Sequence, residues 1–277
     1  MERGAISAGE FGVAFKGFLE QAAAHAPVEE PFFARRLNEH FGRDPGELPV
    51  VGQGFPSRDQ PNLQRALDTF LASNDRRADF VGVVSTYKRF NGVGLADLVS
   101  KHERNGLMGS NAPGPGPVEY IDVALGDTDA ITCMKSGLIL VEDESDGRLA
   151  LLVNSSENGV NRGQINVEAM ARTREEAEAF LAELRQTVRE CNVYRGRMIS
   201  LEQERYQPIT VRVHPTPDIE RSSIILPSGV LERVERHTVE FARHAVRLRE
   251  ARQHIKRGLL LHGPPGTGKT LTAKYIA

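Results

Sequence analysis

The chain has 277 residues, enough for about two domains at roughly 100–200 residues each. Hydrophobic residues make up 40% and charged residues 26%, which excludes wholesale disorder and an integral membrane protein. The formal net charge of −2 gives no general attraction to nucleic acid or to an anionic membrane, so neither is an expected partner. The N-terminus lacks the pattern of a secretory signal, and the expected location is the cytoplasm.

Residues 1–110 are predicted to form a mostly helical N-terminal segment. Apolar side chains recur at helical spacing over 59–72, with Pro61 in the first turn, and 10–26 and 29–41 show weaker patterns of the same kind. A Gly- and Pro-rich stretch, 109–117, is too dense in these residues for a helix and is expected to be a linker.

Residues 118–201 are predicted to form a small α+β module. Thr173 and Glu176 have the spacing of a capping box, and a buried stripe follows them, so a helix begins there. Short runs rich in Val, Ile and Leu are expected to be strands; they cover 118–125, 131–141, 149–153, 164–170 and 197–201.

Four prolines between 202 and 228 forbid a continuous helix, so this stretch is expected to be an extended linker. After it, apolar residues step by three and four along 229–250, which predicts an amphipathic helix.

The strongest motif follows that helix. Leu259–Leu261 reads as a short apolar strand, and the next residues match G-x-x-x-x-G-K-[ST] without a mismatch. A helical pattern starts at Leu271. Strand, glycine loop and helix together are typical of a phosphate-binding P-loop, whereas a plain glycine-rich turn would need none of these specific residues. The predicted nucleotide-binding residues of this stretch are Gly263, Pro264, Pro265, Gly266, Thr267, Gly268, Lys269, Thr270 and Leu271.

The chemistry of this motif predicts binding of ATP with Mg²⁺. Glycines let successive backbone N–H groups point into one cavity, and the N-terminus of the following helix adds partial positive charge. Lys269 is expected to reach the β- and γ-phosphates, and the hydroxyl of Thr270 to bind Mg²⁺.

The sequence of this loop, which follows a Leu-rich strand, resembles the corresponding loop of the AAA family of ATPases. Ile224-Ile225-Leu226-Pro227 and the long helix after it are similar in layout to the family's lead-in. The resemblance implies that Ile224 and Ile225 contact the adenine base. It also implies an ATP-hydrolysing remodelling protein, assembled as a homo-oligomeric ring hexamer, whose N-terminal region (here 1–201) recognises a protein substrate or adaptor.

The fold expected overall is α/β: a mostly helical segment, a small α+β module, and over 229–277 the beginning of a P-loop ATPase domain. In the AAA family the acidic strand that polarises the attacking water and the arginine finger lie further along the chain, beyond Ala277. No catalytic residue is therefore assigned, and we expect ATP hydrolysis of a full-length parent protein but little or none of this chain alone.

Two alternatives stay open. The chain could be a non-enzymatic module that binds a partner through 1–201 and carries an incomplete nucleotide site, but the intact Lys269 and Thr270 speak against this. It could also be another P-loop NTPase, such as a kinase or a transport ATPase. The Pro264-Pro265 pair and the long preceding helix favour the AAA type.

Overall fold

The computed structural model describes residues 7–25, 30–73, 75–84, 92–100, 113–126, 129–144, 147–156, 163–203, 207–215 and 218–276. The chain divides into two compact units. The first, here called the sheet unit, comprises 1–193 and 201–212, and the second, the P-loop unit, comprises 194–200 and 213–277.

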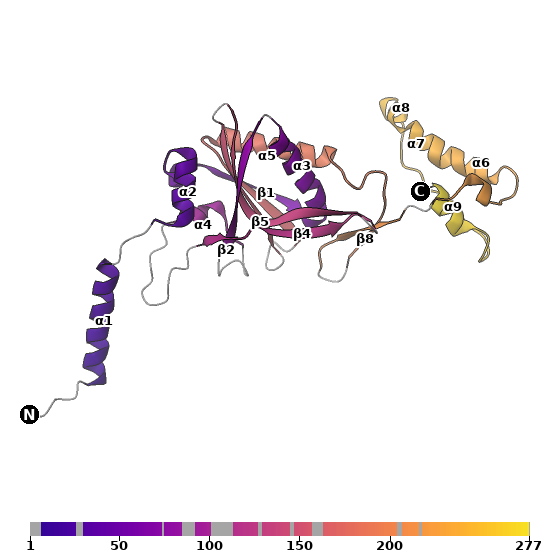
Figure 1. Ribbon diagram of the computed structural model, residues 1–277. Helices are drawn as coiled ribbons and strands as arrows, with labels where there is room; N and C mark the ends of the chain where they lie inside the picture. Colours follow the sequence, from indigo (N-terminus) through magenta and orange to yellow (C-terminus); the bar gives the residue numbers. More distant parts are fainter. Residues whose placement is uncertain are drawn as a thin grey trace, which may run out of the picture. The chain divides into compact units, whose positions relative to one another are not determined.

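The sheet unit contains a seven-stranded sheet in which every neighbouring pair of strands is antiparallel (Figure 1). The strand order is β1-β7-β6-β5-β2-β3, and β4 also pairs with the long strand β5. The strands are β1 (Val50–Pro56), β2 (Arg77–Val84), β3 (Gly114–Gly116), β4 (Glu119–Ala124), β5 (Ala130–Glu142), β6 (Arg148–Ser156) and β7 (Gln164–Met170).

Helices cover both faces of this sheet because its central strands are apolar on both sides. Along β5, Ile139 and Val141 belong to the core under α3 (Gln60–Ala72) and α5 (Arg174–Glu190). Leu138 and Leu140 belong to the opposite core, under α2 (Phe32–Phe41) and α4 (Leu95–Val99). The period of two along a strand sends neighbouring side chains to opposite faces, so one strand supplies both cores.

The remaining elements lie outside the seven-stranded sheet and the helices that cover it. A separate two-stranded sheet consists of β8 (Met198–Glu202) and β9 (Thr210–His214), and α1 (Ala8–His25) is the first helix. A nearly continuous helical stretch comprises α6 (Val230–Glu235), a π-helical turn (Arg236–Glu240), α7 (Phe241–Arg243) and α8 (Ala245–Glu250). Helix α9 (Lys269–Ile276) follows the P-loop. Within the described ranges, no helix combines the length and the apolar character that crossing a membrane requires.

The prediction of a mixed α/β fold is confirmed, and the sheet is antiparallel. The helices predicted over 10–26, 29–41 and 59–72 are present as α1, α2 and α3. The description of 1–110 as mostly helical is incomplete, because β1 and β2 lie in it and pair with β7 and β5. Gly52, Gly54 and Pro56 interrupt any strand pattern in β1, yet an edge strand tolerates them since one of its sides needs no partner.

The strands and the helix expected within 118–201 are present as β4 to β8 and α5, but β5 and β7 also pair with β2 and β1 of the preceding segment. The Thr173 hydroxyl oxygen accepts a 3.3 Å hydrogen bond from the Glu176 N–H, and the Glu176 carboxylate accepts one of 3.3 Å from the Thr173 N–H. Part of the expected linker 109–117 is instead strand β3, and 109–112 lies outside the described residues. The expected extended linker 202–228 contains β9. The domain boundaries 1–110, 118–201, 202–228 and 229–277 stay predictions.

Candidate nucleotide-binding site

The glycines of the P-loop adopt backbone conformations that other residues rarely reach. Gly266 and Gly268 have φ angles of 79° and 80°, in the left-handed region. At Gly263, an added Cβ would lie 2.9 Å from the Thr267 hydroxyl oxygen, closer than real contacts allow. The loop therefore needs glycine at these positions, for reasons of backbone geometry and of space.

Lys269 is the first residue of α9, and its side chain turns back into the loop. Its Nζ donates hydrogen bonds to the carbonyl oxygens of Gly263, at 2.8 Å, and of Pro264, at 2.6 Å. The Thr267 hydroxyl lies 3.4 Å from the same ammonium and donates to the Pro264 carbonyl at 2.9 Å. The loop thus encloses a positive charge at the N-terminus of a helix, an arrangement that attracts anions.

A cavity of about 540 Å³ opens beside the loop. One wall comes from the loop and the segment before it, and the other from Leu226, Pro227 and α6. The lining is mainly apolar, and its basic residues are Arg233, His237, His262 and Lys269. No Asp or Glu of the described chain is among the lining residues. This apolar cavity lies next to a positively charged glycine loop. The combination suits a ligand with an apolar ring at one end and phosphates at the other.

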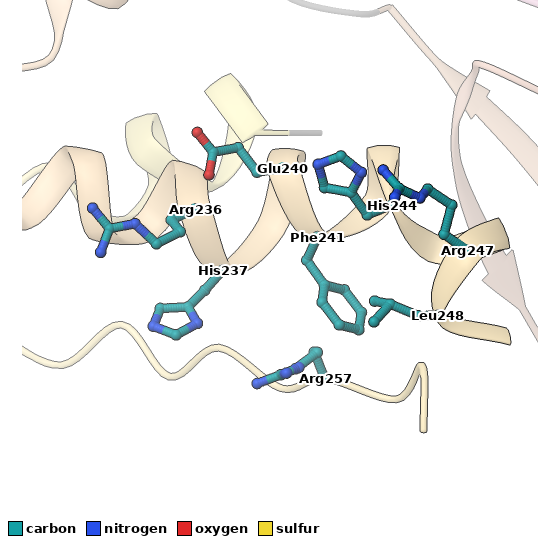
Figure 2. Close-up of a pocket in the computed structure, with 8 residues that line it drawn as sticks. All are labelled: Arg236, His237, Glu240, Phe241, His244, Arg247, Leu248 and Arg257. Atoms are coloured by element: carbon teal, nitrogen blue, oxygen red, sulfur yellow. The ribbon is translucent and has the colours of Figure 1, made fainter. Parts of the chain in front are cut away.

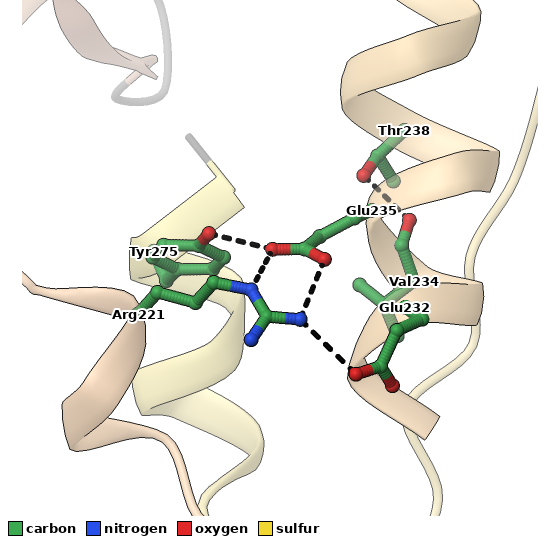
Figure 3. A network of polar contacts seen from close by, with 6 residues as sticks. All are labelled: Arg221, Glu232, Val234, Glu235, Thr238 and Tyr275. Carbon is green, nitrogen blue, oxygen red and sulfur yellow. Dashed lines mark hydrogen bonds and ion pairs between the residues drawn. The ribbon is translucent and has the colours of Figure 1, made fainter. Parts of the chain in front are cut away.

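The helices on either side of the cavity are joined by a polar network (Figure 3). Glu235 of α6 accepts two hydrogen bonds from the Arg221 guanidinium, at 2.8 and 3.1 Å, and one of 2.7 Å from the Tyr275 hydroxyl of α9. Arg221 also donates to Glu232, at 3.2 Å. The bidentate pair with Arg221 fixes the Glu235 carboxylate, and the Tyr275 hydroxyl that donates to it joins α6 to α9.

The same contacts shift the acid–base properties of the network. The hydrogen bond from Arg221 is the main cause that lowers the pKa of Glu235, and the Tyr275 hydroxyl lowers it further. Its bond to Glu235 raises the pKa of Tyr275. Glu235 therefore stays ionised, and Tyr275 keeps its proton as the donor, over the neutral pH range.

Four of the predicted site residues line the cavity: Gly263, Pro264, Thr267 and Lys269. Pro265, Gly266, Gly268, Thr270 and Leu271 belong to the loop or to α9 without lining it. Ile225 is 93% exposed and Ile224 is buried, and neither lines the cavity; their contact with a base stays a prediction.

Sequence reasoning missed the contribution of α6. Val230, Arg233, Val234 and His237 line the cavity, at the spacing of one helix face. The apolar residues that predict this helix form a stripe that shares only Val234 with the face lining the cavity, so the pattern does not reveal this face. The buried Thr272 was missed too; its hydroxyl donates a 2.9 Å hydrogen bond to the Gly268 carbonyl, fixing the loop to the first turn of α9.

The predicted strand at Leu259–Leu261 is wrong as far as the described chain goes, since 258–263 has no regular secondary structure. A strand is defined by hydrogen bonds to a neighbouring strand, and no described segment pairs with this one. Its apolar residues instead help to line the cavity, while Leu260 stays 88% exposed.

Thr270 is exposed, and its hydroxyl makes no hydrogen bond within the described ranges. It is therefore accessible to an ion held by the phosphates of a nucleotide. The described part of the chain contains no group of three or more His, Cys, Asp or Glu side chains that could hold a metal by themselves. A Mg²⁺ bound here would thus take most of its ligands from phosphate oxygens and water.

Comparison with known proteins finds two short similarities, and no family model matches the chain. The chain is 34% identical over 84 residues to the ATP-dependent zinc metalloprotease FtsH of Opitutus terrae, which is 30% of this chain and 12% of that protein. It is 54% identical over 39 residues to the ATP-dependent zinc metalloprotease FtsH 3 of Symbiobacterium thermophilum, 14% of this chain and 6% of that protein. The matches thus span about an eighth or less of the relatives' length, and they indicate a partial relation to an AAA protein.

Proposed function

We propose that this protein binds ATP with Mg²⁺ at residues 263–270 and belongs to an AAA-type remodelling ATPase. The observation that carries the proposal is the position of Lys269, whose ammonium lies inside a loop closed by left-handed glycines. Phosphate oxygens would replace the loop carbonyls as partners of this ammonium, and the apolar side of the cavity would receive the base.

Each residue has a distinct part in this proposal. The backbone N–H groups of the loop and of the first turn of α9 bind the phosphates, and Lys269 supplies charge to the β- and γ-phosphates. Thr270 binds the Mg²⁺ that accompanies the nucleotide. Val230 and Val234 form the apolar wall opposite the loop, where a base would exclude water.

The resemblance to AAA proteins supports the rest of the proposal. ATP hydrolysis would belong to the full-length parent protein, assembled as a homo-oligomeric ring, with the hexamer as the expected form. Residues 1–201 would recognise a protein substrate or adaptor. The partial similarity to FtsH favours the AAA type over another P-loop NTPase, such as a kinase.

The test is a titration of the full chain with a fluorescent ATP analogue and Mg²⁺, comparing the wild type with Lys269→Ala. Loss of the ammonium should weaken binding at least tenfold, about 1.4 kcal/mol. Lys274→Ala is the matched control, because Lys274 lies on the same helix, is exposed and does not line the cavity. Equal affinity of wild type and Lys269→Ala would refute the proposal.

A second candidate is a non-enzymatic module that binds a partner through 1–201. Two observations favour it. No carboxylate is among the described lining residues of the cavity, and residues 259–261 pair with no strand of the described chain. Absence of nucleotide binding by the wild type, with both units folded, would select this candidate.

A further inference from the structure

A second concave surface lies in the P-loop unit and has a different character from the nucleotide cavity. Helical residues 236–248 and the extended segment that carries Arg257 form an open groove of about 620 Å³ (Figure 2). We call it the arginine groove, after Arg236, Arg247 and Arg257, which line it. Phe241 and Leu248 also line it, and Figure 2 shows both pointing from the helix toward the segment of Arg257.

The three arginines of this groove carry uncompensated charge. Within the part of the chain that the structure describes, none of them forms an ion pair, and Glu240 is the one acidic lining residue. Arg221 of the same unit is different, since Glu232 and Glu235 neutralise it. On the same helical stretch Glu232 and Glu235 are thus engaged by Arg221, while Arg236 and Arg247 line the groove.

The local backbone also departs from a regular α-helix at this groove. Arg236–Glu240 forms a π-helical turn, and such turns are costly and occur frequently at functional sites. Both ends of this turn, Arg236 and Glu240, line the groove. The irregular turn therefore lies at the arginine groove, where the three arginines form no ion pair within the described residues.

We propose that the arginine groove binds an acidic peptide segment, one that alternates carboxylate and apolar side chains. Guanidinium groups bind carboxylates through two parallel hydrogen bonds, and Phe241 with Leu248 offers an apolar floor for the intervening side chains. From Arg236 to Arg247 a helix rises about 16.5 Å, at 1.5 Å per residue. That length matches about five residues of extended peptide at 3.3 Å each.

The contacts within the groove favour a peptide over a nucleic acid. The Arg257 guanidinium lies over the Phe241 ring, 4.5 Å from its centroid, so that ring face is not free to stack on a base. Glu240 would repel phosphates and carboxylates alike, but it can accept hydrogen bonds from peptide N–H groups, which a nucleic acid backbone lacks. This inference does not depend on nucleotide binding at the P-loop.

The experiment measures fluorescence anisotropy of a fluorescein-labelled peptide of alternating Glu and Leu, titrated with the full chain. Reversing two groove charges, in the double variant Arg236→Glu, Arg247→Glu, should weaken binding at least tenfold. The control double variant Arg243→Glu, Arg249→Glu makes the same change of net charge on the same helical stretch, at exposed positions outside the groove. It should bind the peptide nearly as well as the wild type.

Two results would overturn the proposal. Equal loss in both double variants would mean that binding reflects net charge alone. Binding of a single-stranded RNA oligonucleotide that is lost only in the groove variant, without peptide binding by the wild type, would assign the groove to nucleic acid. Circular dichroism of each variant checks its fold, and Arg236→Gln, Arg247→Gln replaces the charge reversal if that variant unfolds.

Discussion

The hydroxyl of Tyr275 donates a 2.7 Å hydrogen bond to Glu235, and this contact joins the helix after the P-loop to the helix before it. Because Glu235 also accepts two hydrogen bonds from Arg221, the carboxylate is held on both sides. Helix α9 is thus fixed at its end by Tyr275 and at its start by Lys269, whose ammonium is bound to the loop. Helix α9 therefore has a fixed contact near each end, and the contact of Lys269 also ties the preceding loop to it.

Replacement of Tyr275 by Phe should therefore loosen α9 without removing any residue of the loop. We expect amide hydrogens of α9 to exchange severalfold faster in Tyr275→Phe, because the ring remains and only the bond to Glu235 is lost. Hydrogen exchange read by mass spectrometry measures this. Tyr120→Phe in the sheet unit, where Tyr120 is half exposed, serves as the control and should leave α9 unchanged. Unaltered exchange in Tyr275→Phe would show that the contact does not hold the helix.

The stability of the sheet unit should depend on the protonation of His40. Burial is the main cause that lowers the pKa of His40 below its ordinary 6.5, and a hydrogen bond with the Leu149 carbonyl, at 3.1 Å, offsets this in part. As the pH falls through 6.5, the unfolded chain takes up a proton at His40 before the folded chain does. The free energy of unfolding therefore decreases on acidification.

Urea denaturation above and below pH 6.5, on wild type and His40→Gln, tests this dependence. Glutamine can still donate to the Leu149 carbonyl but does not titrate, so the variant should lose less stability on acidification than the wild type. Other titrating groups contribute equally to both proteins and cancel in the difference. An identical pH dependence in the two proteins would show that His40 does not cause it.

The parts of the fold that could be predicted from the sequence are those with local signals. The capping box at Thr173 marked the start of α5 to the residue, because its two hydrogen bonds involve only neighbouring side chains and backbone. Strand β7 was predicted with its observed bounds, 164–170, since its apolar residues alternate inside a sheet covered on both faces.

Strands β1 and β2 could not be predicted, because distant partners decide their conformation. Gly52 and Gly54 read locally as loop residues, and β1 exists through seven paired positions with β7, which follows it by about a hundred residues. The same limit applies to the candidate site. The P-loop follows from a contiguous motif, whereas the wall formed by Arg233 and His237 depends on how α6 packs beside the loop.

We expect this chain to bind nucleotide without turning it over. Hydrolysis needs a group that orients and polarises the attacking water, and no carboxylate of the described chain lines the cavity. Phosphate release from ATP should therefore not exceed the release in a parallel sample of Lys269→Ala. Turnover that is clearly present in the wild type and abolished by Lys269→Ala would contradict this expectation, because it would require a catalytic group that we have not assigned.

Two threonines on α9 should have separable roles. Thr270 is exposed with a free hydroxyl in the described chain, whereas Thr272 is 2% exposed and bound to the Gly268 carbonyl at 2.9 Å. Thr270→Val should abolish the gain in nucleotide affinity that Mg²⁺ provides, and leave stability nearly unchanged. Thr272→Val should keep that gain and lower the free energy of unfolding by about 1 kcal/mol, the usual contribution of one hydrogen bond.

The two variants are matched in chemistry, since each exchanges a hydroxyl for a methyl group on the same helix. Titration of a fluorescent ATP analogue with Mg²⁺ and with EDTA separates the metal-dependent part of the affinity from the rest. Because Thr270→Val retains the Lys269 ammonium and the loop glycines, its affinity in EDTA should equal that of the wild type. An undiminished Mg²⁺ effect in Thr270→Val, or an equal loss in Thr272→Val, would remove Thr270 from the metal site and leave phosphate oxygens and water as the ligands of the ion.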